Sequence, residues 1–235
     1  MKRYKKENPL SYTLGAALTF ELLKHHKELV TAVYLHPQFS EGQAKEELIA
    51  LCKKERINIS ESEKAFNILS PKENCFVIGE FEKFDAPLQK DGNHVVLVNP
   101  SNAGNLGTIL RSCLGFGYKD IAIIRPAVDI FDPKTVRASM GALFGVRFAY
   151  FDTFEEYAKL VGERAFYPFM LQTDTALHSC TFQKPHALIF GNESSGLPAS
   201  FLEIGTPVII KHSQEIDSLN LPIAVSVALY EASKQ

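Results

Sequence analysis

Three stretches, two of which contain glycine, carry the side chains in this sequence that could do chemistry. Residues 99–112 read NPSNAGNLGTILRS, residues 191–198 read GNESSGLP, and residues 218–222 read SLNLP. Together they combine amides, hydroxyls, one carboxylate and one guanidinium. Glycine lets the backbone approach a ligand closely, and the free amides at a helix start attract anions. The three stretches therefore predict a ligand site, although each alone could be an ordinary loop.

The first stretch offers Arg111 as its only charged side chain. Gly104 and Gly107 are expected to let the backbone turn tightly and approach a ligand. Arg111 follows Gly107 by one helical turn on the same face, and helical side chains lean toward the N-terminus. We therefore expect its guanidinium to reach back over the loop. The alternative is a glycine turn followed by a surface arginine.

The other two stretches offer a carboxylate and two helix-capping residues. Glu193 accepts hydrogen bonds, but its spacing alone does not assign it as a general base. Ser218 and Asn220 are good helix-cap residues, and Pro222 suits a first helical turn. Simple capping is the alternative role for both residues.

The half of the chain that contains these stretches predicts a parallel α/β sheet. Its apolar runs are continuous, as in strands buried on both faces, and ligands bind beyond the carboxyl ends of such strands. Helix starts are expected at Asp132, with Pro133, and at Thr153, with Glu156. The last helix is apolar on nearly all sides, so we expect the sheet and a second subunit to cover it. The expected strands are 95–98, 121–124, 146–151, 166–171, 187–190 and 208–210.

The first part of the chain predicts a smaller αβαβαβ unit. Helical spacing spans residues 14–22, and capping boxes at Ser40 with Gln43 and at Ser60 with Glu63 indicate two further helices. The expected strands are 30–35, 57–59 and 75–81. Residues 83–93 are polar and aperiodic, which is typical of a linker. The expected domains are therefore 1–82 and 94–235, joined by 83–93.

Composition limits the classes of protein to which this chain can belong. With 235 residues, 46% hydrophobic and 22% charged, it is a globular protein and not a disordered one. A net charge of −2 offers no global attraction to phosphate, so any contact with nucleic acid must be local. The four cysteines lack CxxC spacing, which favours free buried thiols over zinc or redox sites. A basic N-terminus without a cleavage site indicates a cytoplasmic protein.

The stretches, taken in this order, resemble the SpoU (TrmH) family of SPOUT RNA methyltransferases over roughly residues 95–234. The first motif is Asn-x-Gly-Asn-Leu-Gly-x-x-x-Arg, and a second, RASMGA, occupies residues 137–142. Gly-x-Glu-x-x-Gly-Leu and Ser-Leu-Asn complete the pattern. The matching residues outside 137–142 are Asn102, Gly104, Asn105, Leu106, Gly107, Arg111, Gly191, Glu193, Gly196, Leu197, Ser218, Leu219 and Asn220.

The resemblance implies a deep trefoil-knotted α/β catalytic domain that forms a homodimer through the knot region. It implies transfer of the methyl group of S-adenosylmethionine, without a metal, to a ribose 2′-hydroxyl of rRNA, or alternatively of tRNA. The first domain is similar to a ribosomal-protein-L30-like substrate-binding domain. By position, the cofactor-binding residues are Gly191, Ile210 and Leu219, and the reaction-site residues are Asn105, Arg111, Glu193, Ser218 and Asn220.

Arg111 is expected to grip an RNA phosphate and direct the hydroxyl, because a guanidinium stays protonated in proteins. No side chain is assigned as the base. With a net charge near zero, the RNA contacts are expected at a few basic residues. These are Lys2, Arg3, Lys5, Lys6, Arg111, Arg137 and Lys211.

Two departures from the family pattern leave alternatives open. Where the family reads Ile-Pro-Met-x-Gly, this chain has Ile210 followed by Lys211, His212, Ser213 and Gln214, and Pro222 replaces a serine. The altered loop lies beside the expected cofactor site, where His212 is expected to be a neutral lining residue. A non-catalytic RNA-binding relative is one alternative. An NADP-dependent oxidoreductase is another, because Asn102-x-Gly104-x-x-Gly107 is one substitution from a dinucleotide fingerprint.

Overall fold

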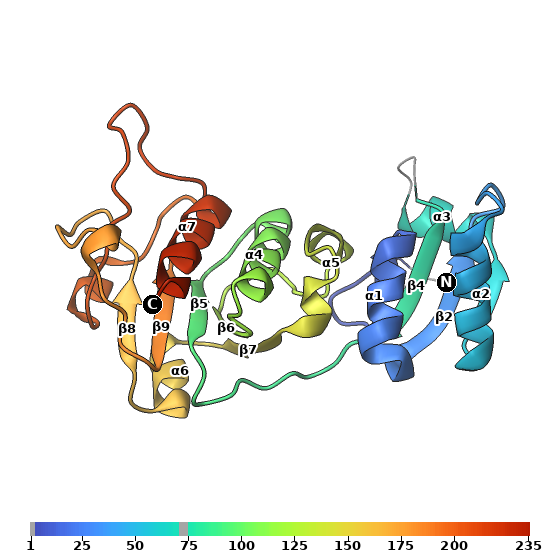
Figure 1. Ribbon diagram of the computed structural model, residues 1–235, viewed down its shortest axis with the longest axis horizontal. Coiled ribbons are helices and arrows are strands. Elements are labelled where there is room, and N and C mark those ends of the chain that lie inside the picture. Colours follow the sequence, from blue (N-terminus) through green and yellow to red (C-terminus); the bar gives the residue numbers. More distant parts are fainter. Residues whose placement is uncertain (1–2, 71–74) are drawn as a thin grey trace.

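The computed structural model describes residues 3–70 and 75–235, which form two β-sheets toward opposite ends of an elongated molecule (Figure 1). One expected RNA contact, Lys2, lies outside the described residues. The first sheet has the strand order β1-β4-β2-β3, and the second has the order β7-β6-β5-β9-β8. Residues 83–93 run between the two sheets (Figure 1).

The first sheet is mixed. Strand β4 pairs antiparallel with both β1 and β2, whereas β2 and β3 are parallel. Leu22 of α1 and Leu48 of α2 pack with Phe81 in the main core, and Phe66 of α3 packs in a separate, smaller cluster. The elements are β1 (Leu10–Leu14), α1 (Ala16–His26), β2 (Val30–Leu35), α2 (Gln43–Lys54), β3 (Asn58–Glu61), α3 (Glu63–Leu69) and β4 (Val77–Glu82).

The sequence prediction for this sheet missed β1 and misplaced two helix caps. Strand β1 buries Ser11 and Thr13 on one face and Tyr12 on the other, so neither an apolar run nor an apolar alternation marks it in the sequence. Helix α2 begins after Gly42 with no side-chain cap, not after Ser40. Helix α3 is capped by Ser62, which accepts a hydrogen bond from the Ala65 amide at 3.3 Å, and not by Ser60.

The second sheet is entirely parallel, as predicted. Successive side chains of a strand point to opposite faces. Val95 and Leu97 pack with α4, α5 and α7, whereas Val96 packs with α6 on the other face, which explains the continuous apolar runs. The elements are β5 (His94–Val98), α4 (Ala103–Gly115), β6 (Asp120–Ile124), α5 (Pro133–Ala138), β7 (Arg147–Phe151), α6 (Phe154–Val161), β8 (Ala165–Pro168), β9 (His186–Phe190) and α7 (Leu221–Ser233).

The expected strand at 208–210 is wrong. Val208 and Ile209 make only isolated bridges, to Phe169 and Ala176. Pro207, directly before them, has no N–H with which to extend a ladder. The helix starts of this half are confirmed, since Asp132 accepts from the Lys134 amide at 2.8 Å and Thr153 accepts from the Glu156 amide at 3.2 Å.

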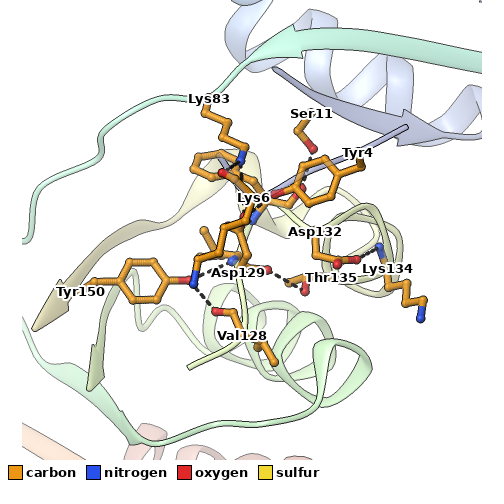
Figure 2. Close-up of polar contacts among 12 residues, drawn as sticks. Tyr4, Lys6, Ser11, Lys83, Val128, Asp129, Asp132, Lys134, Thr135 and Tyr150 are labelled. Carbon is orange, nitrogen blue, oxygen red and sulfur yellow. Dashed lines mark hydrogen bonds and ion pairs between the residues drawn. The ribbon is translucent and has the colours of Figure 1, made fainter. Parts of the chain in front are cut away.

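A polar network joins the N-terminal segment to the loop before α5 (Figure 2). The Asp129 carboxylate accepts from the Tyr4 hydroxyl and from the Lys83 ammonium at 3.3 Å, and Ser11 Oγ donates to the Phe131 carbonyl at 2.5 Å. The Lys83 and Asp129 side chains are only 16% and 12% exposed. The network therefore holds the two sheets together through partly buried charges.

Asp129→Ala is expected to lower the free energy of unfolding by about 2–4 kcal/mol, because it removes the counter-ion of the partly buried Lys83 ammonium and the acceptor of the Tyr4 hydroxyl. Urea titration measures the change. The matched control is Asp152→Ala, because Asp152 is 72% exposed in its pair with Arg125. That substitution should change stability by about 0.5 kcal/mol or less. Equal effects of the two substitutions would contradict a stabilising junction.

Two buried histidines are held neutral in the core of the second sheet. His94 Nε2 lies 2.8 Å from the Gln89 carbonyl, so it donates there, and Nδ1 accepts from the Tyr157 hydroxyl at 2.9 Å. His186 donates through Nδ1 to the Gln183 carbonyl at 3.0 Å and accepts from Tyr118 at 2.7 Å. Burial lowers the pKa of each imidazole to about 4.

These two histidines predict acid destabilisation between about pH 6.5 and pH 4. Below pH 6.5 the unfolded chain binds protons that the folded chain does not, so stability falls until the folded imidazoles also titrate. Each contributes about 3 kcal/mol at most. Urea unfolding across this range measures the slope, which His94→Gln should reduce. The exposed His178 provides the control variant, His178→Gln. A slope unchanged by His94→Gln would overturn the assignment.

Candidate functional site

The Glu193 carboxylate joins the loop after β9 to the start of α4. Its Oε2 accepts from the Ser101 amide at 3.0 Å and from Ser101 Oγ at 2.8 Å. Its Oε1 accepts from the Asn102 amide at 3.1 Å and from Asn105 Nδ2 at 3.2 Å. A helix N-terminus carries a partial positive charge. The anion expected at this helix start is therefore the chain's own carboxylate.

Glu193 stays ionised near neutral pH. Burial by itself raises the pKa of the carboxyl, but hydrogen bonds from Ser101 and Asn105 outweigh burial, and the pKa lies below its ordinary value. A carboxylate with a lowered pKa is a weak proton acceptor. The geometry therefore suits Glu193 to organising the two loops rather than to general-base chemistry.

Asn192 strengthens the same connection and was not singled out from the sequence. Its Nδ2 donates to the Asn99 carbonyl at 2.8 Å, and its Oδ1 accepts from the Ser194 amide at 2.9 Å. Asn99 has a positive φ of 55°, a conformation that asparagine adopts more readily than most residues. Asparagine side chains commonly accept from the backbone amide two residues further on, and an asparagine in a polar loop directly after a strand is the Asx-turn signal that could have identified Asn192.

A cavity of about 320 Å³ lies beyond the carboxyl ends of β8 and β9. This size falls within the range of about 300–1,000 Å³ that small-molecule sites occupy. The Phe169 and Phe190 rings, which both line the cavity, stack with centroids 4.5 Å apart. The predicted site residues among its lining are Gly191, Glu193, Ile210, Ser218 and Leu219.

Gly191 is the point of closest backbone approach in the cavity wall. A β-carbon there would lie 2.1 Å from the carbonyl carbon of Gly196 and 2.3 Å from the Leu197 amide nitrogen. Gly196 itself adopts a positive φ of 67°. Gly191 therefore lets the loop fold back closely on its own backbone, and this loop forms part of the cavity wall.

The expectation that Gly107 approaches a ligand is wrong. A β-carbon at Gly107 would lie 2.5 Å from the Thr135 carbonyl oxygen and 2.8 Å from the Ser139 amide nitrogen. Gly107 therefore allows α4 and the α5 region to pack closely. A dinucleotide-binding site needs a glycine that faces the ligand and a helix start that is free to bind phosphate. Gly107 faces the α5 region and Glu193 occupies the start of α4, so neither requirement of the oxidoreductase alternative is met.

The remaining reaction-site residues lie outside the cavity lining. Arg111 is exposed, and within residues 3–70 and 75–235 its guanidinium makes no hydrogen bond or ion pair. Asn105 reaches the site through Glu193. Asn220 holds the N-cap position of α7 without a side-chain capping bond, so side-chain capping does not explain it. The expected RNA contacts that are described are all exposed, and they are Arg3, Lys5, Lys6, Arg111, Arg137 and Lys211.

Three further observations concern metals, thiols and membranes. In the described part of the chain, no group of three or more histidine, cysteine, aspartate or glutamate side chains is placed to hold a metal ion. The four cysteines are buried as free thiols. No helix among the described residues has the length and hydropathy needed to cross a membrane.

Comparison with known proteins shows similarity centred on the second sheet. The model of the SpoU rRNA Methylase family matches residues 92–230. An uncharacterized tRNA/rRNA methyltransferase of Synechocystis is 33% identical over 144 residues, 60% of this chain and 53% of that protein. A 23S rRNA (uridine(2479)-2′-O)-methyltransferase of Streptomyces viridochromogenes is 31% identical over 157 residues, 63% of this chain and 55% of that protein. The chain thus spans about half the length of these curated relatives.

A solved structure is similar along nearly the whole chain. The AdoMet-bound rRNA methyltransferase from Sinorhizobium meliloti superposes with a TM-score of 0.80 at 27% identity. The superposition covers 96% of this chain and 87% of that one. The similarity therefore extends through both sheets.

Glu193→Ala should release the two loops that Glu193 connects. We expect faster amide hydrogen exchange at Ser101 and Asn102, because both amides lose their acceptor. Glu193→Gln should have a smaller effect, since one acceptor oxygen remains. Glu203→Gln, which removes an exposed carboxylate ten residues further along the chain, is the control. Unchanged exchange at both amides in Glu193→Ala would contradict the role given to this carboxylate.

Proposed function

Because the chain belongs to the SpoU rRNA methylase family, we propose that it transfers the methyl group of S-adenosylmethionine to a ribose 2′-hydroxyl of structured RNA. The observation that carries this proposal is the cavity built on Gly191 and linked through Glu193 to the start of α4. The AdoMet-bound Sinorhizobium structure and the 2′-O-methyltransferase from Streptomyces support it. Ribosomal RNA is the proposed target, with tRNA as the alternative.

The cavity fits the proposed cofactor. Gly191 brings backbone to the wall, Ile210 and Leu219 add apolar surface, and the stacked Phe169 and Phe190 rings offer a flat apolar contact. The bound cofactor would supply an electrophilic sulfonium methyl group. Because that methyl group is already reactive, the protein's main task is to bind the cofactor and align the hydroxyl with it.

We assign Arg111 to the RNA rather than to the cofactor. Its exposed guanidinium, which has no hydrogen-bond or ion-pair partner among the described residues, is free to make charge-assisted hydrogen bonds to a phosphate and so position the neighbouring ribose. Asn105, on the same helix, is fixed by Glu193. Ser218 and Asn220 complete the proposed reaction site. Ser218 lines the cavity, and the Asn220 side chain makes no capping hydrogen bond to α7.

The first sheet is the proposed RNA-selecting domain, similar to ribosomal protein L30, over residues 1–82. Residues 83–93 would be its linker and 94–235 the catalytic domain. Exposed Arg3, Lys5 and Lys6 support an RNA contact near the N-terminus. Phosphate contacts of this local kind are compatible with a net charge of −2.

The catalytic domain is proposed to be knotted and to form a homodimer. Supporting the knot, the chain after β9 returns to pair with the segment after β8 and then packs α7 against α4. Supporting the dimer, α7 exposes Ile223, Val227 and Tyr230, although it is apolar on nearly all sides. We place the protein in the cytoplasm, where both classes of substrate RNA occur.

Mapping 2′-O-methyl groups in cellular RNA tests the activity. Deletion of the gene should remove one or a few sites, and the wild-type gene should restore them. Arg111→Ala should fail to restore them, while the purified variant binds S-adenosylmethionine within about twofold of wild type, because Arg111 lies outside the cavity lining. An unchanged map after deletion would instead favour a non-catalytic RNA-binding relative.

A further inference from the structure

We infer that the partly exposed rings of His36, Phe39 and Phe76 form a platform on which an unpaired base of the RNA substrate stacks. This inference rests on the proposed function and names a surface of the first sheet that would contact the RNA. The rings come from the loop after β2 and from the segment before β4. The His36 amide joins these two segments by donating to the Phe76 carbonyl at 2.9 Å.

The three rings are held beside the core rather than within it. The His36 ring lies edge-on to the buried Phe66 ring, with centroids 5.0 Å apart, and edge-on to the Phe76 ring at 5.7 Å. The Phe39 and Phe76 rings are nearly parallel, at 10°, with centroids 6.4 Å apart. All three rings are partly exposed, and Phe76 packs in none of the core clusters of the described residues. Unpaired RNA bases stack on phenylalanine and histidine rings that are presented in this way.

His36 adds a hydrogen-bond donor to the platform. Its Nδ1 accepts from the Gln38 amide at 3.1 Å, so the proton of the neutral ring lies on Nε2. Nε2 has no hydrogen-bond partner among the described residues, and it is not one of their buried polar atoms. The platform therefore offers an N–H group as well as flat rings. The edges of RNA bases carry carbonyl and ring-nitrogen acceptors that such a group can bind.

Arg137 places a positive charge near the platform. Its side chain is exposed and makes no hydrogen bond or ion pair with the described residues. Burial raises the pKa of Cys75, and the positive charge of Arg137 acts against that effect. The guanidinium therefore lies within electrostatic range of Cys75, which directly precedes Phe76. A base stacked on the platform would bring its phosphate toward this charge, and a guanidinium binds phosphate well.

Two carboxylates lie near Phe39 on the other side of the platform. The Lys45 ammonium donates to the Phe39 carbonyl at 3.4 Å and pairs with Glu41 at 2.6 Å and with Glu61 at 3.8 Å. Lys45 therefore offsets part of their negative charge. We place the phosphate on the Arg137 side for this reason.

The platform faces the same side of the molecule as the cofactor cavity. Residues 83–93 leave the end of β4 and enter the start of β5 along the lower side of the view in Figure 1. The start of β4, where Phe76 lies, and the carboxyl end of β5 are therefore both on the upper side. Strands β8 and β9, whose carboxyl ends adjoin the cavity, run parallel to β5. One RNA molecule could thus contact the platform and the cavity from a single side.

A fluorescent variant of the full chain tests the stacking directly. The chain contains no tryptophan, so Phe76→Trp introduces a single indole and keeps a flat ring on the platform. Ribosomal RNA purified from the gene-deletion strain should quench its emission, because a stacked base quenches an indole. Transfer RNA from the same strain is the second probe. Leu160→Trp is the control, since Leu160 is 46% exposed on α6, and its emission should not change.

Two further substitutions separate stacking from simple packing. Phe76→Leu keeps an apolar side chain but removes the aromatic face, so the KM for RNA should rise about fivefold to a hundredfold. The kcat and the affinity for S-adenosylmethionine should stay within about twofold of wild type, because the cavity is unchanged. Phe76→Tyr keeps the aromatic face and should retain the wild-type KM. A wild-type KM in Phe76→Leu, with or without a lower unfolding temperature, would assign Phe76 to the fold and overturn the inference.

The emission of Phe76→Trp decides the remaining cases. Emission that is unaffected by an RNA that the wild type methylates would overturn the platform. Emission that depends on protein concentration in the absence of RNA would identify a contact between copies of the chain, and it would also overturn the inference. If the wild type methylates neither RNA but either RNA quenches the emission, the platform is supported and the proposed activity fails. If neither methylation nor quenching occurs, both fail.

Discussion

The site depends on one charge, the Glu193 carboxylate at the positive end of α4. The first amides of a helix have no partner within the helix, and a partly buried carboxylate needs donors. Here the backbone amides of Ser101 and Asn102 and the side-chain amide of Asn105 donate hydrogen bonds to the carboxylate. Two loops that are about 90 residues apart along the chain are thereby held together. The hydrogen bonds of Glu193 therefore position its loop, which forms part of the cavity wall.

From α4, a continuous series of contacts leads to the other sheet. Helix α4 packs against α5 because Gly107 leaves room for the Thr135 carbonyl. The Thr135 hydroxyl donates to the Asp129 carbonyl at 3.1 Å, and the Asp129 carboxylate holds Tyr4 and Lys83. The start of α4 and the N-terminal segment are thus connected through packed backbone and hydrogen bonds, of which those around Asp129 are drawn in Figure 2.

Much of the second sheet could be predicted from sequence because its strands are buried on both faces and read as apolar runs. Strand β1 could not, since its three buried residues, Ser11, Tyr12 and Thr13, all carry hydroxyl groups and do not form an apolar run. At the site, residue types indicated two loops that line the cavity, in residues 191–198 and 218–222, whereas no residue of the stretch 99–112 lines it. The anion at the start of α4 could not be predicted, because only the folded chain brings Glu193 to Asn102. The residues around the helix start do not indicate whether its amides bind a ligand anion or a carboxylate of the chain itself.

The position of β9 has a consequence for the order in which this protein forms. Strand β9 lies between β5 and β8, yet it is the last strand along the chain. The middle of the sheet therefore cannot close until residues up to Phe190 have left the ribosome, and the loops around the cavity follow later still. Long-range parallel pairing of this kind is intrinsically slow. During synthesis, the N-terminal sheet has time to fold while one edge of β5 still waits for β9.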